Sequence, residues 1–217
     1  VIIATGIGGI QTLENEHGII NNRGPRRVSP LFVSKMIPNI AGGHLSMKFG
    51  FRGPSQTIIS ACASSNDAIG IALRLIRYGD ADIMLTGGTE ASITPLTISG
   101  FANMKALSQN CTNPSKASRP FDIDRDGFVL SEGAGILVLE SEEHALKRDA
   151  PILAELAGYG STDDAFHITQ PAPEGLGANK AMKNALLDAN LLPNDINYVN
   201  AHGTSTPFND KNESIAI

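Results

Sequence analysis

The chain has 217 residues, of which 41% are hydrophobic and 18% charged, and its formal net charge is -5 at pH 7. This length and composition predict a globular protein with a substantial core, and the acidic balance argues against non-specific nucleic-acid binding. No apolar run approaches the roughly 20 residues that span a bilayer, so we expect no membrane association.

The two cysteines, Cys62 and Cys111, lie far apart and do not make a disulfide framework. They fit a reducing compartment. Val1 opens an apolar segment without the charged region or cleavage site of an export signal. These features together predict a cytoplasmic protein.

Apolar strands and helices alternate through the first two thirds of the chain. β-branched and apolar runs predict strands, and apolar residues spaced three and four apart, such as Ile69, Leu73 and Ile76, predict helices. Buried strands are predicted at residues 1–4, 57–60, 82–86 and 135–140, and helices at 30–45 (interrupted by Pro38), 66–78 and 142–148.

A second region opens at Pro151. Here we predict a strand at 152–158, a polar loop at 160–173, a helix at 177–190, a strand at 196–201 and a helix beginning near Asp210. Buried strands separated by helices indicate an α/β fold.

Two glycine- and aspartate-rich patterns resemble known binding loops without completing them. The segment from Gly6 to Gln11 has the first two glycines of a dinucleotide-binding turn, but Gln11 stands where the third glycine belongs. The segment 122–127 opens like a calcium loop, but Gly133 occupies the position of the required bidentate glutamate. We therefore expect no metal site.

Cys62 lies directly between the predicted strand 57–60 and the predicted helix 66–78. A thiol at a helix N-terminus faces unpaired backbone N–H groups, which favour the thiolate. Cys62 is thus a candidate nucleophile. The alternative is a buried structural cysteine, which is common for this residue type.

His202 follows the predicted strand 196–201, and ligands bind at strand ends in α/β sheets. A histidine there can donate a hydrogen bond or move a proton. The alternative is a structural histidine in a loop. The arginines of the loop 22–27 form a local basic spot on an acidic chain, which fits either a partner or a solvated loop.

Several motifs, taken together and in order, resemble an elongating β-ketoacyl-acyl-carrier-protein synthase of the synthase II type. They are SACASS at 60–65, GDAD at 79–82, GGTE at 87–90, SRPFD at 118–122, RDGF at 125–128, SEGAG at 131–135 and NAHGTSTP at 200–207. The resemblance extends over essentially the whole chain.

The resemblance implies a thiolase-like fold with five layers, α-β-α-β-α, built from two similar halves and incomplete at both ends. Residues 1–150 would be the C-terminal part of the first half, with the nucleophile, and residues 151–217 the start of the second half, with the first catalytic histidine. The family's second histidine and its glycine-rich gating loop belong to segments outside this sequence. We therefore expect the family activity from a longer parent and little or none from residues 1–217 alone.

The resemblance also implies a mechanism. Cys62 would carry an acyl group as a thioester, and malonyl-carrier protein would lose CO2 and attack that thioester, which elongates a fatty acid by two carbons. His202 would hold the malonyl thioester oxygen, and Thr204 and Thr206 would contact the phosphopantetheine arm. We expect no cofactor, because the phosphopantetheine arrives on the carrier protein.

Further residues match family positions that line the acyl pocket or face the carrier protein. Ile7, Phe32 and Phe101 correspond to the pocket, although each also fits an ordinary core position. Arg26, Arg27 and Lys105 correspond to the surface that faces acyl carrier protein, where opposite charge aids encounter. The family is dimeric, so we expect a homodimer.

The chain departs from the family in one place: Asn209 stands before Asp210 where the family commonly has glycine. Asparagine tolerates a positive φ, so we expect the turn to survive. Three alternative functions remain: a polyketide ketosynthase domain with the same residues, a non-catalytic partner of the chain-length-factor type, which lacks the cysteine, and a coenzyme A thiolase, which the motif around His202 disfavours.

Overall fold

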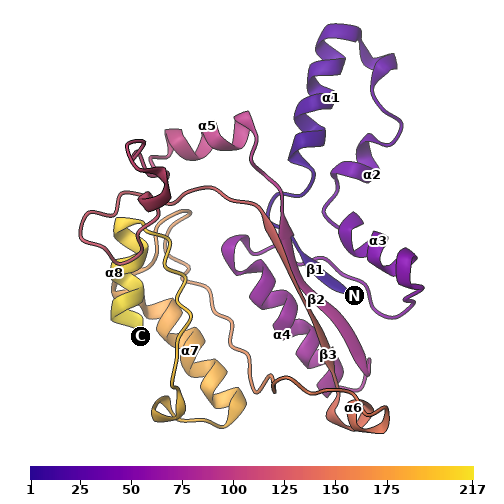
Figure 1. Cartoon of the computed structure of the whole chain (residues 1–217), viewed down its shortest axis with the longest axis vertical. Coiled ribbons are helices and arrows are strands. Elements are labelled where there is room, and N and C mark those ends of the chain that lie inside the picture. The colour runs from indigo at the N-terminus through magenta and orange to yellow at the C-terminus, as the bar shows by residue number, and fades with distance from the viewer. The chain divides into compact units, whose positions relative to one another are not determined.

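A computed structural model describes all residues of the chain, 1–217 (Figure 1). It divides into two compact units. Unit 1 contains Val1–Leu96 and Ser131–Leu156, and unit 2 contains Thr97–Leu130 and Ala157–Ile217.

Unit 1 contains a three-stranded sheet in the order β1-β2-β3, made of β1 (Ile2–Ala4), β2 (Ile83–Glu90) and β3 (Gly133–Glu140). β1 pairs with β2 in parallel, with Ile2 opposite Thr86. β3 pairs with β2 antiparallel along its whole length, from Glu140 opposite Ile83 to Gly133 opposite Glu90. The C-terminal end of β2 therefore has one neighbour on each side.

The helix α4 (Ser64–Arg77) packs against this sheet, beside β2 (Figure 1). Ala68 and Ala72 on α4 are fully buried against Ile2, Ala4 and Met84, which form the core cluster. Small alanine side chains let the helix approach the strands closely. Since α4 begins just after Cys62, this packing fixes where the cysteine lies.

The remaining helices of unit 1 are α1 (Ile10–Arg23), α2 (Phe32–Met36), α3 (Ile40–Phe49) and α6 (Glu142–Lys147). α1 was not predicted. The separation of α2 and α3 around Pro38 confirms the predicted interruption. The backbone N–H of Gly9 donates to the carbonyl of Met36 at 3.1 Å, which ties the glycine turn ahead of α1 to the end of α2.

Unit 2 is formed by helices and loops without a strand. It contains α7 (Leu176–Ala189), α8 (Pro207–Ala216) and most of α5 (Pro95–Asn103). The side-chain amide of Asn179 on α7 donates to the carbonyl of Ala216 at the end of α8 at 2.8 Å. No helix in either unit has the length and apolar character that a bilayer crossing requires.

Three segments that were predicted as strands do not form strands, so these predictions are wrong. Residues 57–60, 152–158 and 196–201 form no ladder, and next to the first of them only an isolated bridge joins Gln56 to Ile2. An extended apolar segment becomes a strand only where another strand offers a hydrogen-bonding edge, and these segments have none in this chain.

The prediction that β3 is buried is also wrong. Ile136, Leu137 and Val138 are 42%, 48% and 62% exposed. β3 is an edge strand with a neighbour on only one side, and the helix α4 packs mainly against β2. An apolar run in the sequence predicts a strand here but does not predict which faces of that strand are covered.

Candidate active site

Cys62 lies in a single 3-10 turn, Ala61–Ala63, that leads directly into α4. Ala61 before it has a left-handed φ of 51°, a conformation that is costly for a residue with a Cβ. Local hydrogen bonds hold this turn: the hydroxyl of Ser64 accepts from the N–H of Ser60 at 2.8 Å and donates to the carbonyl of Ala61 at 2.7 Å. The side chain of Ser60 also donates to Asp67 in the first turn of α4.

Cys62 is exposed and forms no disulfide, so the interpretation as a buried structural cysteine is wrong. Its turn borders a cavity of about 310 Å³ within unit 1, which is lined by Ala4, Thr5, Gly6, Ala61, Cys62, Ser64, Ser65, Gly88, Thr89, Glu90, Gly133, Ala134 and Gly135. These residues come from the ends of all three strands and the start of α4. A thiol that opens on a cavity at strand ends and a helix N-terminus can act as a nucleophile.

His202 belongs to unit 2 and lies, exposed, in the loop before α8. One carboxylate holds its backbone: Glu213 on α8 accepts from the N–H of His202 at 2.5 Å and from the N–H of Gly203 at 2.8 Å. The loop therefore has a defined conformation although it contains no regular secondary structure.

Thr204 and Thr206 lie side by side in the same loop, with their hydroxyl oxygens 2.8 Å apart. Thr206 is also the N-cap of α8, where its side chain accepts from the N–H of Asn209 at 3.3 Å. Between the two threonines, Ser205 is fully buried with a left-handed φ of 66°. The structure thus brings His202, Thr204 and Thr206 into one loop, as the sequence predicts.

Asp210 is buried at the centre of the hydrogen bonds in this region, with 1% of its surface exposed. Its carboxylate accepts from the backbone N–H groups of Phe121 at 2.7 Å and Ser205 at 3.2 Å. Arg125 lies 3.6 Å from it and donates to the carbonyls of Thr206 and Pro207 at 3.1 and 2.9 Å. One buried charge therefore joins the loop around Phe121 to the loop around His202.

Nearby, Asp126 closes the segment that resembles a calcium loop. The hydroxyl of Ser108 donates to it at 2.6 Å and, with the N–H of Gln109, lowers the pKa of the Asp126 carboxyl. Arg119 pairs with it at 3.0 Å. The chain has no cluster of three or more side chains that would suit a metal ion.

Asn209 does not adopt the positive φ that the family pattern suggested for its position. It lies inside α8, and its side-chain amide donates to Asp210 at 3.2 Å and to Glu213 at 3.3 Å. The departure from glycine thus adds a link between the two carboxylates that organise the loop.

The residues predicted to line the acyl pocket fall in both units. Ile7 lies in the turn before α1 and is 39% exposed, and Phe32 is the first residue of α2, so both belong to unit 1. Phe101 belongs to unit 2, where its ring packs edge-on against Phe128 with the centroids 5.2 Å apart. Phe101 is partly buried, so both the pocket and the packing interpretations of this residue stay predictions.

The basic residues predicted to face a partner are likewise divided. Arg26 and Arg27 form an exposed 3-10 turn after α1 in unit 1. Lys105 lies in unit 2 and is exposed, with a left-handed φ of 56°.

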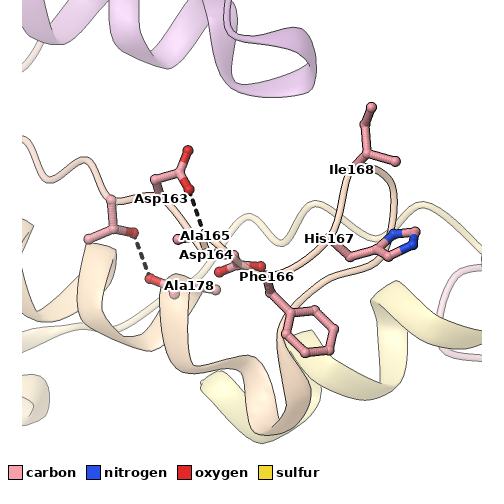
Figure 2. A pocket seen from close by; sticks show the side chains of 9 residues that line it. Asp163, Asp164, Ala165, Phe166, His167, Ile168 and Ala178 are labelled. Carbon is pink, nitrogen blue, oxygen red and sulfur yellow. Dashed lines mark hydrogen bonds between the residues drawn. The ribbon is translucent and has the colours of Figure 1, made fainter.

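A second cavity, of about 690 Å³, lies within unit 2 in the polar loop before α7 (Figure 2). Its polar groups are occupied by the loop itself: Asp163 accepts from the N–H of Ala165 at 2.6 Å, and Thr162 donates to the carbonyl of Gly177 at 2.8 Å. His167 accepts backbone N–H groups of Thr169 and Gln170 through Nδ1. None of the predicted site residues borders this cavity.

Three carboxylates that organise the site are not among the predicted site residues: Glu90, Asp210 and Glu213. Glu90 ends β2 and accepts hydrogen bonds from the turn at residues 5–7. Two sequence signals could have identified them: Glu90 lies two residues after the glycine pair 87–88, and Asp210 and Glu213 follow the His202 motif within two helical turns. Carboxylates there are placed to accept N–H groups from irregular loops.

Two family models match the chain: the N-terminal domain of beta-ketoacyl synthase at residues 1–145 and the C-terminal domain of beta-ketoacyl synthase at residues 153–217. The curated 3-oxoacyl-[acyl-carrier-protein] synthase 2 of Staphylococcus aureus is 52% identical over 217 residues, which are 100% of this chain and 54% of that protein. The synthase 2 of a Synechocystis strain is 51% identical over the same residues, 52% of its length. The chain spans about half the length of these curated relatives.

The solved structures that are similar to this chain are ketosynthases as well. A type II polyketide ketosynthase, solved with its acyl-carrier protein and bound to a hexaketide, superposes with a TM-score of 0.94 at 40% identity, over 99% of this chain and 54% of that one. A beta-ketoacyl synthase from Burkholderia phymatum gives 0.91 at 37% identity, over 99% of this chain and 52% of that one. The fold is therefore the thiolase-like α/β fold of ketosynthases, and the chain belongs to the beta-ketoacyl synthase family.

Proposed function

We propose that this chain carries the acyl-accepting part of a 3-oxoacyl-acyl-carrier-protein synthase that elongates fatty acids by two carbons. The observation that carries the proposal is Cys62: an exposed thiol at the start of α4 that opens on a cavity at the strand ends. The 52% identity to curated synthase 2 proteins supports fatty-acid elongation over other condensations.

In the first step the Cys62 thiolate attacks the carbonyl of an acyl thioester. A bond forms between Sγ and the acyl carbon, and the carrier's phosphopantetheine thiol leaves. In the second step malonyl-carrier protein loses CO2, and the resulting carbanion attacks the acyl-Cys62 carbonyl and releases the thiol. No redox or metal cofactor takes part in either step as proposed.

His202 would donate a hydrogen bond to the malonyl thioester oxygen while negative charge develops there. The two hydrogen bonds from the His202 and Gly203 backbone to Glu213 support this role, because they hold the backbone of the loop in one conformation. Thr204 and Thr206 would contact the phosphopantetheine arm from the same loop.

The proposed partner is acyl carrier protein. It would bind at Arg26, Arg27 and Lys105, which are exposed basic residues on an acidic chain. A similar ketosynthase was solved in complex with its acyl-carrier protein, which supports this assignment. We further propose a cytoplasmic homodimer with residues 1–150 and 151–217 belonging to successive halves of the fold. The boundaries of the two family matches, at 145 and 153, support that division.

The test is acylation, by an acyl-carrier thioester, of a full-length protein that contains residues 1–217, followed by mass spectrometry of peptides. We expect the adduct on Cys62, its loss in Cys62→Ala, and its retention in the matched control Cys111→Ala. An adduct on Cys111, or none on either cysteine, would contradict the proposal.

A polyketide ketosynthase is the second candidate, favoured by the 40% identity to the type II ketosynthase of known structure. The two candidates differ in the acyl group that is extended. Faster acylation of Cys62 by saturated acyl-carrier thioesters than by β-ketoacyl ones would favour fatty-acid synthesis.

A further inference from the structure

The turn of Thr5, Gly6, Ile7 and Gly8 follows the end of β1 and carries three consecutive backbone N–H groups, of which one residue accepts two directly and the third through a hydroxyl. Glu90 Oε2 accepts from the N–H of Gly6 at 2.7 Å and of Ile7 at 3.0 Å. Its Oε1 accepts from the hydroxyl of Thr5 at 3.0 Å, and that hydroxyl accepts from the N–H of Gly8 at 3.2 Å. The turn is therefore wrapped around a single carboxylate.

The carboxylate itself is anchored on a rigid element. Glu90 is the last residue of β2, where it pairs with Gly133 on β3, and β2 also pairs with β1 at Gly88. A Cβ added to Gly6 would lie 2.8 Å from Glu90 Oε2, so the close approach needs a residue without a side chain. Loss of the carboxylate would leave the N–H groups of Gly6 and Ile7 without this acceptor.

This arrangement borders the cavity of the proposed nucleophile. Thr5, Gly6, Glu90 and Cys62 all line the cavity of about 310 Å³. Ile7 follows Gly6 directly, and the turn is joined to α2, which begins at Phe32, through the bond from Gly9 to Met36. A movement of the turn would thus displace both proposed acyl-pocket residues of unit 1.

We propose that Glu90 is a positioning residue that sets the acyl-chain length accepted on Cys62 by fixing the turn that carries Ile7. The inference rests on the proposed function, in which Ile7 contacts the acyl chain. Glu90 acts through the backbone of residues 6 and 7 and does not itself touch the reacting atoms.

The chemistry of the three donors explains why a carboxylate occupies this position. Two oxygens that only accept match two N–H groups and one hydroxyl proton. Glutamine would keep one oxygen for the N–H groups but turn an NH2 donor toward Thr5, so Glu90→Gln removes part of the support. Glu90→Ala removes all three hydrogen bonds.

The experiment measures acylation of Cys62, in a full-length protein that contains residues 1–217, by acetyl, octanoyl and tetradecanoyl thioesters of N-acetylcysteamine, with the adduct located by mass spectrometry. We expect Glu90→Ala to lower the ratio of the octanoyl to the acetyl acylation rate by roughly tenfold. Misplaced binding groups slow the reaction only of substrates that are long enough to reach them. The acetyl rate should change less than about threefold, since a short chain does not extend to Ile7.

Glu90→Gln should give an intermediate ratio. The control is Glu132→Ala, which removes another carboxylate that accepts a backbone N–H, that of Ile93 at 2.8 Å, in the same unit. We expect it to leave the ratio unchanged. Alkylation of Cys62 by iodoacetamide, which needs no acyl pocket, should proceed equally in all folded variants.

An unchanged length ratio in Glu90→Ala would overturn the inference. Should that variant fail to fold, Thr5→Val keeps the side-chain shape and removes the hydroxyl that links Gly8 to Glu90, and it must also shift the ratio. If wild-type Cys62 takes no acyl group, the proposed function fails. Amide exchange at Gly6 and Ile7 then tests the positioning alone, with faster exchange in Glu90→Ala in its favour and equal exchange against it.

Discussion

In unit 1 Cys62 is placed by strand pairing and close packing, whereas in unit 2 His202 is placed by hydrogen bonds to carboxylates. The turn of Cys62 leads into α4, whose alanines are buried against a paired sheet. The loop of His202 has no strand beside it and depends on Glu213 and Asp210.

Because Cys62 and His202 are held in place by different interactions, they should be sensitive to different substitutions. A packed helix responds to volume, because interiors are dense and deform little. A loop held by carboxylates responds to the loss of a single charge, because the backbone N–H groups around it then have no acceptor.

The largest effect is expected from Asp210→Ala in unit 2. It leaves Arg125 and two backbone N–H groups without their buried partner, and removal of one member of a buried ion pair costs about 3 kcal/mol or more. The free energy of unfolding from urea denaturation measures the loss. Asp210→Asn keeps the shape and one acceptor oxygen, so it should cost less.

Hydrogen exchange of peptides locates the same effect. Asp210→Ala should deprotect residues around Ser205 more than those of β2. Equal deprotection of both regions would contradict the view that the carboxylate organises unit 2 in particular.

Gly88→Ala tests packing in unit 1. The added Cβ would overlap Ser65 Oγ and lie 3.2 Å from Ser65 Cβ, so the Ser65 side chain must rotate and α4 must shift slightly away from β2. Overpacking of this kind costs about 2 kcal/mol. The shift should also slow alkylation of Cys62, three residues before Ser65, which peptide mass spectrometry measures.

Gly133→Ala is the matched control, since a Cβ there meets nothing within 4 Å. It should change the unfolding free energy by less than about 0.5 kcal/mol. A similar cost for both substitutions would mean that close packing of α4 is not what Gly88 provides.

Thr206→Ala tests a weaker interaction in the same loop, because it removes a local hydrogen bond that involves no buried charge. Thr206 caps α8 by accepting from the N–H of Asn209, and loss of such a cap costs about 1 kcal/mol. Thermal unfolding should therefore show a smaller destabilisation than Asp210→Ala, and Thr206→Ser should retain most of the stability. A larger loss than in Asp210→Ala would reverse the proposed order.

The smallest effect concerns surface charge at the end of β3. Arg148 bonds to Glu140 at 2.6 and 2.7 Å and, with His144, lowers the pKa of Glu140 from 4.5 to about 2. Because the folded state binds the proton less well, the carboxylate contributes stability above pH 4.5, and this contribution is lost as pH falls toward 2.

The measurement is unfolding of wild type and Glu140→Gln as a function of pH. Wild type should be the more stable protein at neutral pH, and the difference should disappear in the acidic range. Glu143→Gln, which removes an exposed pair with Lys147, is the control and should show little pH-dependent difference. A Glu140→Gln difference that persists at pH 2 would contradict the assigned cause.

The sequence alone was sufficient for features that depend on neighbouring residues. The spacing of Ile69, Leu73 and Ile76 predicted α4, and apolar runs predicted β2 and β3, because helix periodicity and strand propensity are local properties. The motifs around Cys62 and His202 also sufficed to identify the family.

Tertiary structure decided what depends on residues far apart in the chain. The segments 57–60, 152–158 and 196–201 have strand-like sequences but no ladder, because a strand exists only with a partner edge. Glu90 bonds to a turn more than 80 residues away, and Asp210 likewise joins Phe121 to Ser205. A carboxylate in a sequence shows its charge but not which N–H groups the fold brings to it, and those contacts hold the turn at residues 6–7 and the loop of His202.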